Sequence, residues 1–411
     1  MDTDVCIIGA GPAGLVVALR LLDAGIDCIV LERLSSEALC VRAKAGMLEH
    51  RTVQALARWG LAAPILEQGT TNGIVEFRID GVGHIFDYAR LTGGRGHFVY
   101  PQHLLVRAWA ARLLEKGGRL HFATEATSID SASAAPCVLR ASAPNGEALS
   151  IACKAIVVAS GAGAGLGPLG GGAGLLPTIV SHEHQHPFRW LTAMIAMAPL
   201  SGRTLYAAHR NGFAAHLRRS AELTRYYLQI PEGDGVEDWP DERLRAELAV
   251  RLGLSGLERI TGPIVERDVL DLRVRVCEPL QHGDVYLVGD AAHLITPAGG
   301  KGMNLAIQDA LELAAGLIER FFEGCPERLA RYSETRLPCI WRAQEFSNWM
   351  LTLFSGGVLN FSRSLPDPGA SFAQRLHRAQ LERLLAERSF ARWFAHRYAG
   401  VDEDGIDEEQ P

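Results

Sequence analysis

The sequence lacks the features that define several common classes of protein. It contains no uninterrupted apolar run of the ~18 residues that a transmembrane helix needs, so we expect no membrane-spanning segment. None of its eight cysteines forms a Cys-x-x-Cys pair or a Cys/His spacing typical of zinc, so we expect reduced thiols and no metal. A net charge of −6, with acidic and basic residues interspersed, gives no overall attraction to nucleic acid.

The N-terminus also lacks a secretory signal. The apolar stretch 5–22 follows Asp2 and Asp4 instead of a basic segment, and glycines and Pro12 interrupt it. We therefore expect a cytoplasmic protein.

The apolar pattern predicts an α/β fold that begins with a βαβ unit. Residues 4–9 and 28–31 read as strands, and residues 14–24 between them read as a helix with an apolar face. The chain of 411 residues exceeds the range of a single hydrophobic core, so two or three packed units are expected. A glycine-rich stretch, 161–174, predicts a loop or linker between units.

Further strands and helices follow from the same patterns. Helices are predicted at 47–59, 102–115, 241–252 and 304–321, and strands at 75–79, 138–143, 156–158, 192–198, 204–208, 214–218, 226–230 and 284–288. The short strands after residue 190 predict a second, sheet-rich unit, and the chain after residue 304 is mainly helical.

Gly9, Gly11 and Gly14 lie between the first strand and the first helix. There, backbone N–H groups and the helix dipole can meet a pyrophosphate that side chains would block. Glu32 ends the second strand, 18 residues after Gly14, where a carboxylate can accept hydrogen bonds from ribose hydroxyls. The alternative is a purely structural glycine-rich turn, and the pattern alone does not separate FAD from NAD.

A second motif, Gly-Asp-Ala-Ala-His at 289–293, follows a predicted strand. Asp290 at such a turn can hydrogen-bond a polyol chain, but Asp is also a preferred helix N-cap, and local sequence favours neither reading.

Taken together, these motifs resemble the class A flavoprotein monooxygenases, which hydroxylate aromatic compounds. Within that family the pattern is most similar to the 4-hydroxybenzoate 3-monooxygenases. The resemblance runs to about Tyr398 and is carried by these further segments: Arg42-Ala-Lys-Ala-Gly-Met-Leu-Glu49, Tyr100-x-Gln102, Arg225-Tyr-Tyr227, Val236-Glu-Asp-Trp239 and Pro297-x-Gly-Gly-Lys-Gly-Met-Asn304.

The resemblance implies FAD as cofactor and assigns residues to it. Glu32 would bind the adenosine ribose, Asp290 the ribityl chain, and the loop from Pro297 to Asn304 would lie against the isoalloxazine, where a helix N-terminus favours negative charge on reduced flavin. The other implied cofactor-binding residues are Arg33, Arg42, Lys44, Gln102, Gly302, Met303 and Asn304.

The resemblance likewise divides the chain into three regions: a discontinuous FAD-binding domain (1–73, 96–180 and 270–350), a substrate-binding sheet domain (74–95 and 181–269), and a helical C-terminal region with an acidic tail (351–411).

For the substrate, the resemblance implies that Arg219 and Tyr227 bind a carboxylate, to which the planar fork of arginine is suited. Tyr206 would hydrogen-bond the phenolic oxygen, Tyr398 would be its partner in a proton relay, and Pro297 would present its carbonyl to the same hydroxyl. The implied reaction uses NADPH or NADH and O2, forms a flavin C4a-hydroperoxide, and transfers oxygen to the carbon ortho to the hydroxyl. Phenolate is the better nucleophile, so donors that stabilise it accelerate transfer.

Several positions depart from the family pattern. Leu217 stands where a Ser would bond the substrate carboxylate, and Asn72 stands where a His would end the proton relay. Ser160, Gly163 and Gly167 replace residues that contact FAD and the nicotinamide cofactor, so the reductant-binding region differs most.

Three functions remain open from the sequence. The first is a monooxygenase that converts 4-hydroxybenzoate, or a close para-substituted benzoate, to its 3-hydroxy product. The second is a tailoring hydroxylase of another aromatic acid, such as 4-aminobenzoate. The third is a non-catalytic flavin protein that senses an aromatic acid. A homodimer is an expectation from the family.

Overall fold

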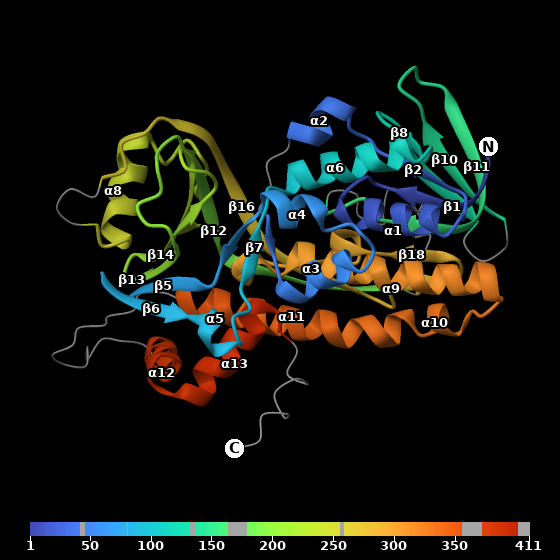
Figure 1. The fold of residues 1–411 in the computed structure, drawn as a ribbon. Helices are drawn as coiled ribbons and strands as arrows, with labels where there is room; N and C mark the ends of the chain where they lie inside the picture. The colour runs from blue at the N-terminus through green and yellow to red at the C-terminus, as the bar shows by residue number, and fades with distance from the viewer. Residues whose placement is uncertain are drawn as a thin grey trace.

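The computed structural model describes residues 1–41, 46–79, 81–131, 136–162, 179–254, 259–355 and 372–401. Two large sheets lie beside each other, and long C-terminal helices run along one side of the molecule beneath both (Figure 1).

The first sheet has eight strands and contains the predicted βαβ unit. Its main path runs β17 (Gln281–His282), β18 (Val285–Leu287), β11 (Ala148–Val158), β1 (Asp2–Ile8), β2 (Cys28–Leu31) and β8 (Arg119–His121), with β10 (Cys137–Ser142) and β9 (Glu125–Ser131) added at β11. Strand β1 pairs in parallel with both β2 and β11. The strands of this parallel core are nearly continuous apolar runs, because helices cover them.

Helices and a small sheet surround this core. Helix α1 (Pro12–Asp23) contacts both α6 (Gln102–Glu115) and α9 (Gly302–Glu323). Beside them lie α2 (Ser36–Val41), α3 (His50–Ala57), α4 (Ala63–Gln68) and a three-stranded sheet of β3 (Met47–Leu48), β7 (His97–Val99) and β4 (Thr70–Asn72). The helix predicted from residue 47 therefore begins only at His50, because Met47 and Leu48 pair with β7.

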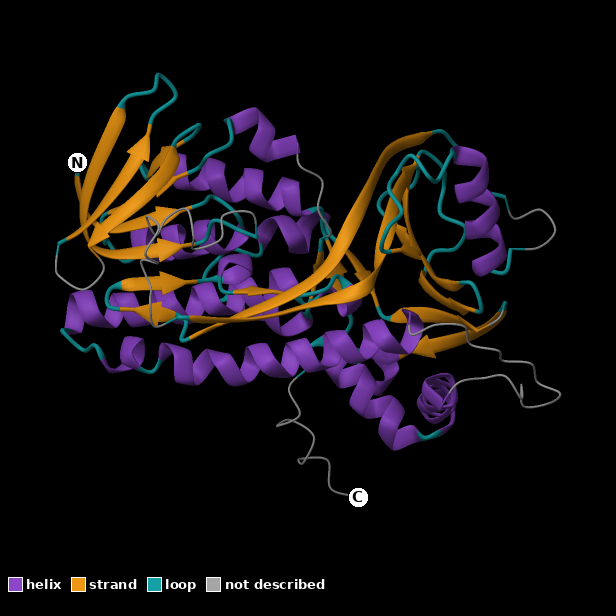
Figure 2. Ribbon diagram, turned by 180° about the vertical axis from the view of Figure 1, so that it is seen from behind, coloured by secondary structure: helices purple, strands orange, loops and turns teal. Residues whose placement is uncertain are grey.

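The second sheet also has eight strands. Their order is β19 (His293–Leu294), β16 (Ile264–Glu278), β12 (Val180–Ile195), β15 (Thr224–Pro231), β14 (Gly212–Arg218), β13 (Thr204–His209), β5 (Ile74–Ile79) and β6 (Val82–Asp87). Helix α8 (Asp241–Arg251) covers one face. The long strands β12 and β16 pair along most of their length and extend toward the first sheet (Figure 2).

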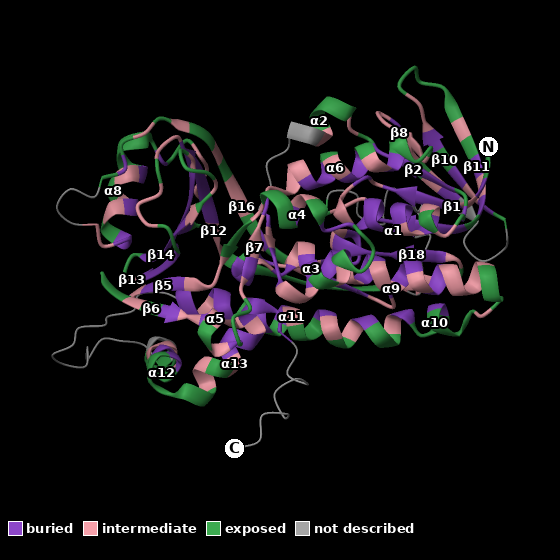
Figure 3. Ribbon diagram, in the orientation of Figure 1, coloured by how far each residue is buried: buried purple, intermediate pink, exposed green. Residues whose placement is uncertain are grey.

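The other face of the second sheet packs against the C-terminal helices. These are α11 (Tyr332–Ser355), α12 (Phe372–Ala386) and α13 (Arg388–Ala399), with α5 (Tyr88–Leu91) beside α13. The short α10 (Glu327–Ala330) contacts α9 instead. Aromatic residues from the sheet and from α11 and α13 form one apolar cluster at this contact. The buried residues concentrate where helices meet the sheets (Figure 3).

The predicted fold class is confirmed: a Rossmann-type α/β core, a sheet-rich second part and a helical C-terminal region. Most of the glycine-rich stretch 161–174 and all of the acidic tail lie outside the described residues, and the three-region division stays a prediction. Among the described residues, no helix is long and apolar enough to cross a membrane, and no cluster of side chains suited to a metal is found. The seven cysteines whose side chains are described are free thiols.

Candidate functional site

The glycine loop brings β1, α1 and β11 very close together. Gly9 has φ +106°, and a Cβ atom there would lie 2.5 Å from the carbonyl oxygen of Ala159. A Cβ on Gly14 would lie 2.0 Å from the carbonyl oxygen of Gly9. Gly11 differs, since a Cβ there would meet nothing within 4 Å. Gly9 and Gly14 therefore have to be glycine, because a side chain there would clash with the backbone where the strands and α1 approach each other. The backbone at Gly11, by contrast, faces open space at the N-terminus of α1.

Two polar side chains border this loop. Glu32 is buried at the end of β2 and accepts hydrogen bonds from the backbone N–H of Ala10 (2.8 Å) and of Leu34 (2.9 Å). Its carboxylate keeps lone pairs for a further donor such as a ribose hydroxyl. Ser160 follows β11, against Gly9, and its hydroxyl is buried without a hydrogen-bond partner among the described residues. An open backbone at a helix N-terminus with a buried, unpaired hydroxyl beside it fits a bound dinucleotide.

The Gly-Asp-Ala-Ala-His motif lies next to this loop. Gly289 has φ +61°, and a Cβ there would lie 3.0 Å from Cβ of Ala306 and 3.5 Å from Cβ of Ala13, so the turn fits between α9 and α1. Asp290 lies inside a short 3-10 helix (Gly289–Ala291), and no side-chain hydrogen bond caps that helix. The N-cap reading therefore has no support, and the carboxylate is available for a ligand.

The loop from Pro297 to Asn304 contains a second 3-10 turn (Ala298–Gly300) and leads into α9. Asn304 is buried, and its amide bonds the backbone of Glu49 (2.8 Å), Met47 (3.0 Å) and Gly300 (2.8 Å). This side chain therefore shapes the loop from within.

The other predicted cofactor and loop residues are placed as follows: Gly302, Met303 and Gln102 are partly exposed at the starts of α9 and α6, Arg33 and Pro297 are exposed, and Arg42, Lys44, Gly163 and Gly167 lie outside the described residues.

On the second sheet, Tyr206, Ala215 and Tyr227 stand in one row. Tyr206 of β13 pairs with Ala215 of β14, which pairs in turn with Tyr227 of β15. Paired residues point to the same face, and strands lie about 4.8 Å apart, so the two tyrosines flank a small residue across roughly 10 Å. We call this row, from Tyr206 across Ala215 to Tyr227, the slot.

Arg219 lies just beyond β14 at the Tyr227 end of the slot. Its Nη2 atom is buried and has no hydrogen-bond partner among the described residues. Burial lowers the pKa of this guanidinium, and the adjacent Tyr227 opposes that shift. A buried cationic donor without an acceptor is costly, so an anion is the expected partner. Leu217, two residues earlier, packs against the apolar cluster and offers no donor.

At the other end of the slot, the hydroxyls of Tyr206 and Tyr398 lie 3.1 Å apart, and both side chains are buried. Burial raises the pKa of Tyr206 to about 12, and it raises the pKa of Tyr398 well above the usual value of 10. Both tyrosines are therefore protonated near neutral pH, and each can donate or accept a hydrogen bond.

Sequence reasoning missed the residues behind Tyr398. His97 and Tyr88 contact its ring, and Lys301 binds its carbonyl oxygen and the carboxylate of Glu49. Only Lys301 and Glu49 lie inside segments that the sequence analysis singled out, and nothing local indicated that they pair.

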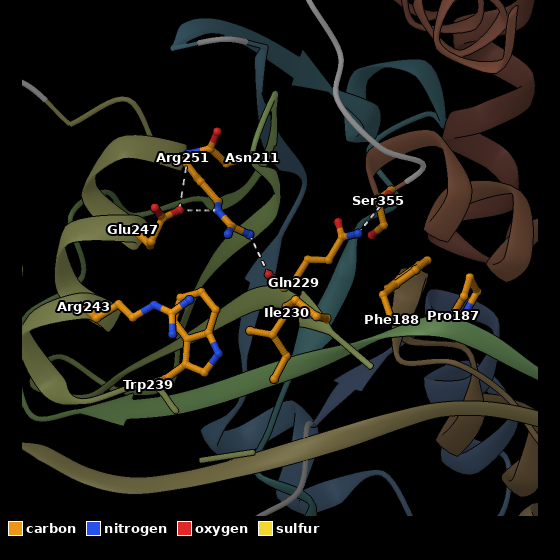
Figure 4. Close-up of a pocket in the computed structure, with 11 residues that line it drawn as sticks. Pro187, Phe188, Asn211, Gln229, Ile230, Trp239, Arg243, Glu247, Arg251 and Ser355 are labelled. Atoms are coloured by element: carbon orange, nitrogen blue, oxygen red, sulfur yellow. Dashed lines mark hydrogen bonds and ion pairs between the residues drawn. The ribbon is translucent and has the colours of Figure 1, made fainter. Parts of the chain in front are cut away.

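A separate cavity of about 680 Å³ lies between α8 and strands β12 and β15 of the second sheet (Figure 4). Its most buried cation, Arg251, bonds Glu247 (3.0 Å) and the carbonyl oxygen of Gln229 (2.7 Å). None of the predicted site residues that the structure describes lines this cavity. Because Arg251 is already paired, its charge gives no indication of a ligand.

Comparison with known proteins identifies the family and its cofactor. The family model described as an FAD binding domain matches residues 2–347. The p-hydroxybenzoate hydroxylase of Acinetobacter baylyi is 31% identical over 404 residues, which cover 98% of this chain and 96% of that protein. The chain belongs to the class A flavoprotein aromatic monooxygenases. FAD, rather than NAD, is therefore the cofactor of this chain.

Other members of the family differ in substrate. The aklavinone 12-hydroxylase of Streptomyces peucetius is 27% identical over 337 residues, which cover 76% of this chain and 67% of that enzyme. The crystal structure of p-nitrophenol 4-monooxygenase from Pseudomonas putida has a TM-score of 0.79 at 21% identity and covers 98% of this chain and 99% of that one. The last likeness concerns the fold. Membership in these monooxygenases implies an aromatic substrate, O2 and a reduced nicotinamide as the typical electron donor.

Proposed function

We propose that this monooxygenase hydroxylates a para-substituted benzoate, with 4-hydroxybenzoate as the first candidate and 3,4-dihydroxybenzoate as its product. The observation that carries the proposal is the arrangement of the slot, which has the buried, unpartnered Nη2 of Arg219 at one end and the Tyr206–Tyr398 hydroxyl pair at the other. A para-substituted benzoate presents a carboxylate and a hydroxyl at opposite ends of one flat ring. The relative from Acinetobacter baylyi, by its name, acts on such a compound.

In this proposal the protein's own residues orient the substrate and stabilise its phenolate. Arg219 and Tyr227 bind the carboxylate and fix the ring in one direction. Tyr206 donates a hydrogen bond to the phenolate oxygen, and Tyr398 donates to Tyr206. These bonds stabilise the phenolate form, whose ortho carbon is more electron-rich than that of the phenol. Bound FAD supplies the oxygen-transfer chemistry, with O2 and NADPH or NADH as co-substrates.

A matched pair of arginine variants tests the carboxylate site. We expect Arg219→Met to raise the KM for 4-hydroxybenzoate roughly 100-fold, because a buried charge pair is lost. Arg218→Met, at the exposed neighbouring position, should leave KM unchanged. The assay measures NAD(P)H oxidation stimulated by 4-hydroxybenzoate, together with the catechol product. A wild-type protein that carries FAD but shows neither stimulation nor catechol contradicts this substrate.

Leu217 favours a second candidate, a tailoring hydroxylase of a different aromatic acid such as 4-aminobenzoate. The expected serine hydroxyl is missing there, so the carboxylate end holds 4-hydroxybenzoate with one donor fewer. Two Streptomyces relatives, named for their action on aklavinone and on tetracycline precursors, support a substrate other than 4-hydroxybenzoate. Titration of the flavin absorbance with a panel of benzoates decides between the two, because the true substrate perturbs it at the lowest concentration.

The third candidate, a sensor without catalysis, predicts that neither NADH nor NADPH reduces the flavin under anaerobic conditions with a benzoate bound. Reduction by either nicotinamide rules it out and also identifies the preferred reductant. The expected homodimer is tested separately by light scattering on the purified protein.

A further inference from the structure

Three buried rings meet behind the Tyr206–Tyr398 pair. Tyr88 at the start of α5, His97 of β7 and Tyr398 of α13 contact one another edge to face. The ring centroids are 4.8 Å apart for His97 and Tyr398, 5.0 Å for Tyr88 and Tyr398, and 5.5 Å for Tyr88 and His97. His97 is fully buried, so its contacts, rather than solvent, determine which nitrogen carries its proton.

The hydrogen bonds of Tyr88 fix that proton. Its hydroxyl bonds the backbone carbonyl of Asn72 and lies 3.0 Å from Nδ1 of His97. A carbonyl only accepts, so the single hydroxyl proton of Tyr88 points to Asn72, and Nδ1–H of His97 must donate to the Tyr88 oxygen. Nε2 of His97 then carries the lone pair, and it is buried without a hydrogen-bond partner among the described residues.

The groups that face His97 keep it neutral. Burial lowers its pKa to about 3, and the charge of Lys301 adds to this effect, while Glu49 and the backbone of Tyr398 oppose it. The carbonyl oxygen of Tyr398 accepts a hydrogen bond from Nζ of Lys301 (2.9 Å), and Nε2 of His97 has no hydrogen-bond partner among the described residues. A neutral His97 ring of fixed orientation can hold the ring of Tyr398 in place without itself being protonated or deprotonated.

We propose that His97 is a positioning residue for the Tyr206–Tyr398 pair, held as the neutral Nδ1–H tautomer by Tyr88 and by the backbone carbonyl of Asn72. Residue 72 thus acts through its backbone instead of as the titrating side chain that the family pattern has there. The edge of His97 fixes the ring of Tyr398, and thereby the direction in which its hydroxyl meets Tyr206 (3.1 Å).

The tautomer can be measured without any substrate. Nitrogen-15 NMR of the FAD-loaded full chain with labelled histidine reports which ring nitrogen is protonated, and His97→Gln assigns the signal. His216 is an internal reference, because its Nε2 accepts the backbone N–H of Leu200 (3.0 Å) and must carry a lone pair. We expect the same Nδ1–H pattern for His97, unchanged between about pH 5.5 and 8.5. An Nε2–H pattern, or titration near neutral pH, overturns the proposal.

Tyr88→Phe removes one hydroxyl and keeps the ring. We expect His97 to lose its fixed tautomer in this variant, and an unchanged spectrum shows that Tyr88 does not hold it. If His97→Gln fails to fold, Tyr88→Phe identifies the same signal by its shift.

The consequence for catalysis rests on the proposed function. With 4-hydroxybenzoate bound, we expect Tyr88→Phe and His97→Gln to lower kcat about tenfold and to reduce the fraction of bound phenolate seen in the ultraviolet spectrum, with substrate Kd unchanged. Wild-type kcat and phenolate in both variants contradict the positioning role. A wild-type enzyme that does not bind 4-hydroxybenzoate contradicts the proposed substrate instead, and the NMR result still decides the role of His97.

Discussion

The ammonium of Lys301 lies 2.6 Å from a carboxylate oxygen of Glu49, and both side chains are buried. The same ammonium donates to the carbonyl oxygens of Arg397 (2.5 Å) and Tyr398 (2.9 Å) in the last turn of α13, where a cation is favourable. Lys301 therefore joins three segments that are distant in sequence: the one before α3, the loop before α9 and the C-terminal helix. The position of Tyr398 depends on this joint.

Loss of the cation at this joint should be costly. We expect Lys301→Met to lower the free energy of unfolding by about 3–5 kcal/mol, because it leaves the carboxylate of Glu49 buried without its main partner. The double variant Lys301→Met with Glu49→Gln should recover part of that loss, since no unpaired charge remains. Urea unfolding followed by circular dichroism measures both.

The exposed pair of Lys116 and Asp23 (2.6 Å) is the matched control. Lys116→Met should cost under about 1 kcal/mol, as is usual for surface ion pairs. Equal losses for Lys301→Met and Lys116→Met would show that burial does not set the energy of the Lys301 pair.

Acid should weaken the fold in two overlapping ranges of pH. The pKa of His97 is lowered from 6.5 to about 3 in the folded state, so the unfolded chain binds its proton first and stability falls as pH drops from about 6.5 to 3. Burial alone would raise the pKa of Glu49, but Lys301 and Arg51 lower it from 4.5 to about 2, so a further loss follows as pH drops from about 4.5 to 2.

The first of these ranges can be assigned to His97. Urea midpoints measured at a series of pH values should decline less steeply between about pH 6.5 and 3 for His97→Gln than for the wild type. Parallel curves for the two proteins would assign that decline to other groups.

The glycine loop separates cofactor binding from folding. Gly11→Ala places a methyl group in open space, so we expect an unchanged unfolding midpoint for the protein without FAD. FAD affinity should fall at least about tenfold, because the methyl group would stand where the pyrophosphate approaches the backbone. Gly14→Ala places a Cβ 2.0 Å from the carbonyl oxygen of Gly9 and should destabilise the apoprotein as well. Fluorescence titration with FAD and thermal unfolding of the apoprotein distinguish the two effects.

Local patterns in the sequence predicted much of the fold. The predicted helix 102–115 has the bounds of α6, and the βαβ unit with its glycines lies where apolar periodicity placed it. The helix predicted from residue 47 starts three residues later, since pairing of Met47 and Leu48 with β7 overrides helix propensity.

Contacts between residues that are distant in sequence could not be predicted in this way, because they produce no local sequence pattern. Lys301 and Glu49 are 252 positions apart, and His97, Tyr88 and Tyr398 come from three separate elements. Each of these side chains reads locally as an ordinary strand or helix residue, so only the folded chain reveals the joint behind Tyr398. Family resemblance predicted roles for Tyr206 and Tyr227, whereas their place in one row across Ala215 comes from the register of the sheet.

Leu217 offers the sharpest test of the carboxylate end of the slot. A serine at this position, two residues before Arg219, adds a hydroxyl donor beside the predicted carboxylate site. Such a bond typically contributes about 1 kcal/mol, so we expect Leu217→Ser to tighten binding of 4-hydroxybenzoate about fivefold. Leu217→Ala removes the same apolar packing without adding a donor, and it should not tighten binding. Flavin absorbance titrations give both Kd values. If the two variants bind 4-hydroxybenzoate equally, the substrate carboxylate does not lie beside residue 217, and a different aromatic acid, or a different orientation in the slot, accounts for the unpartnered Nη2 of Arg219.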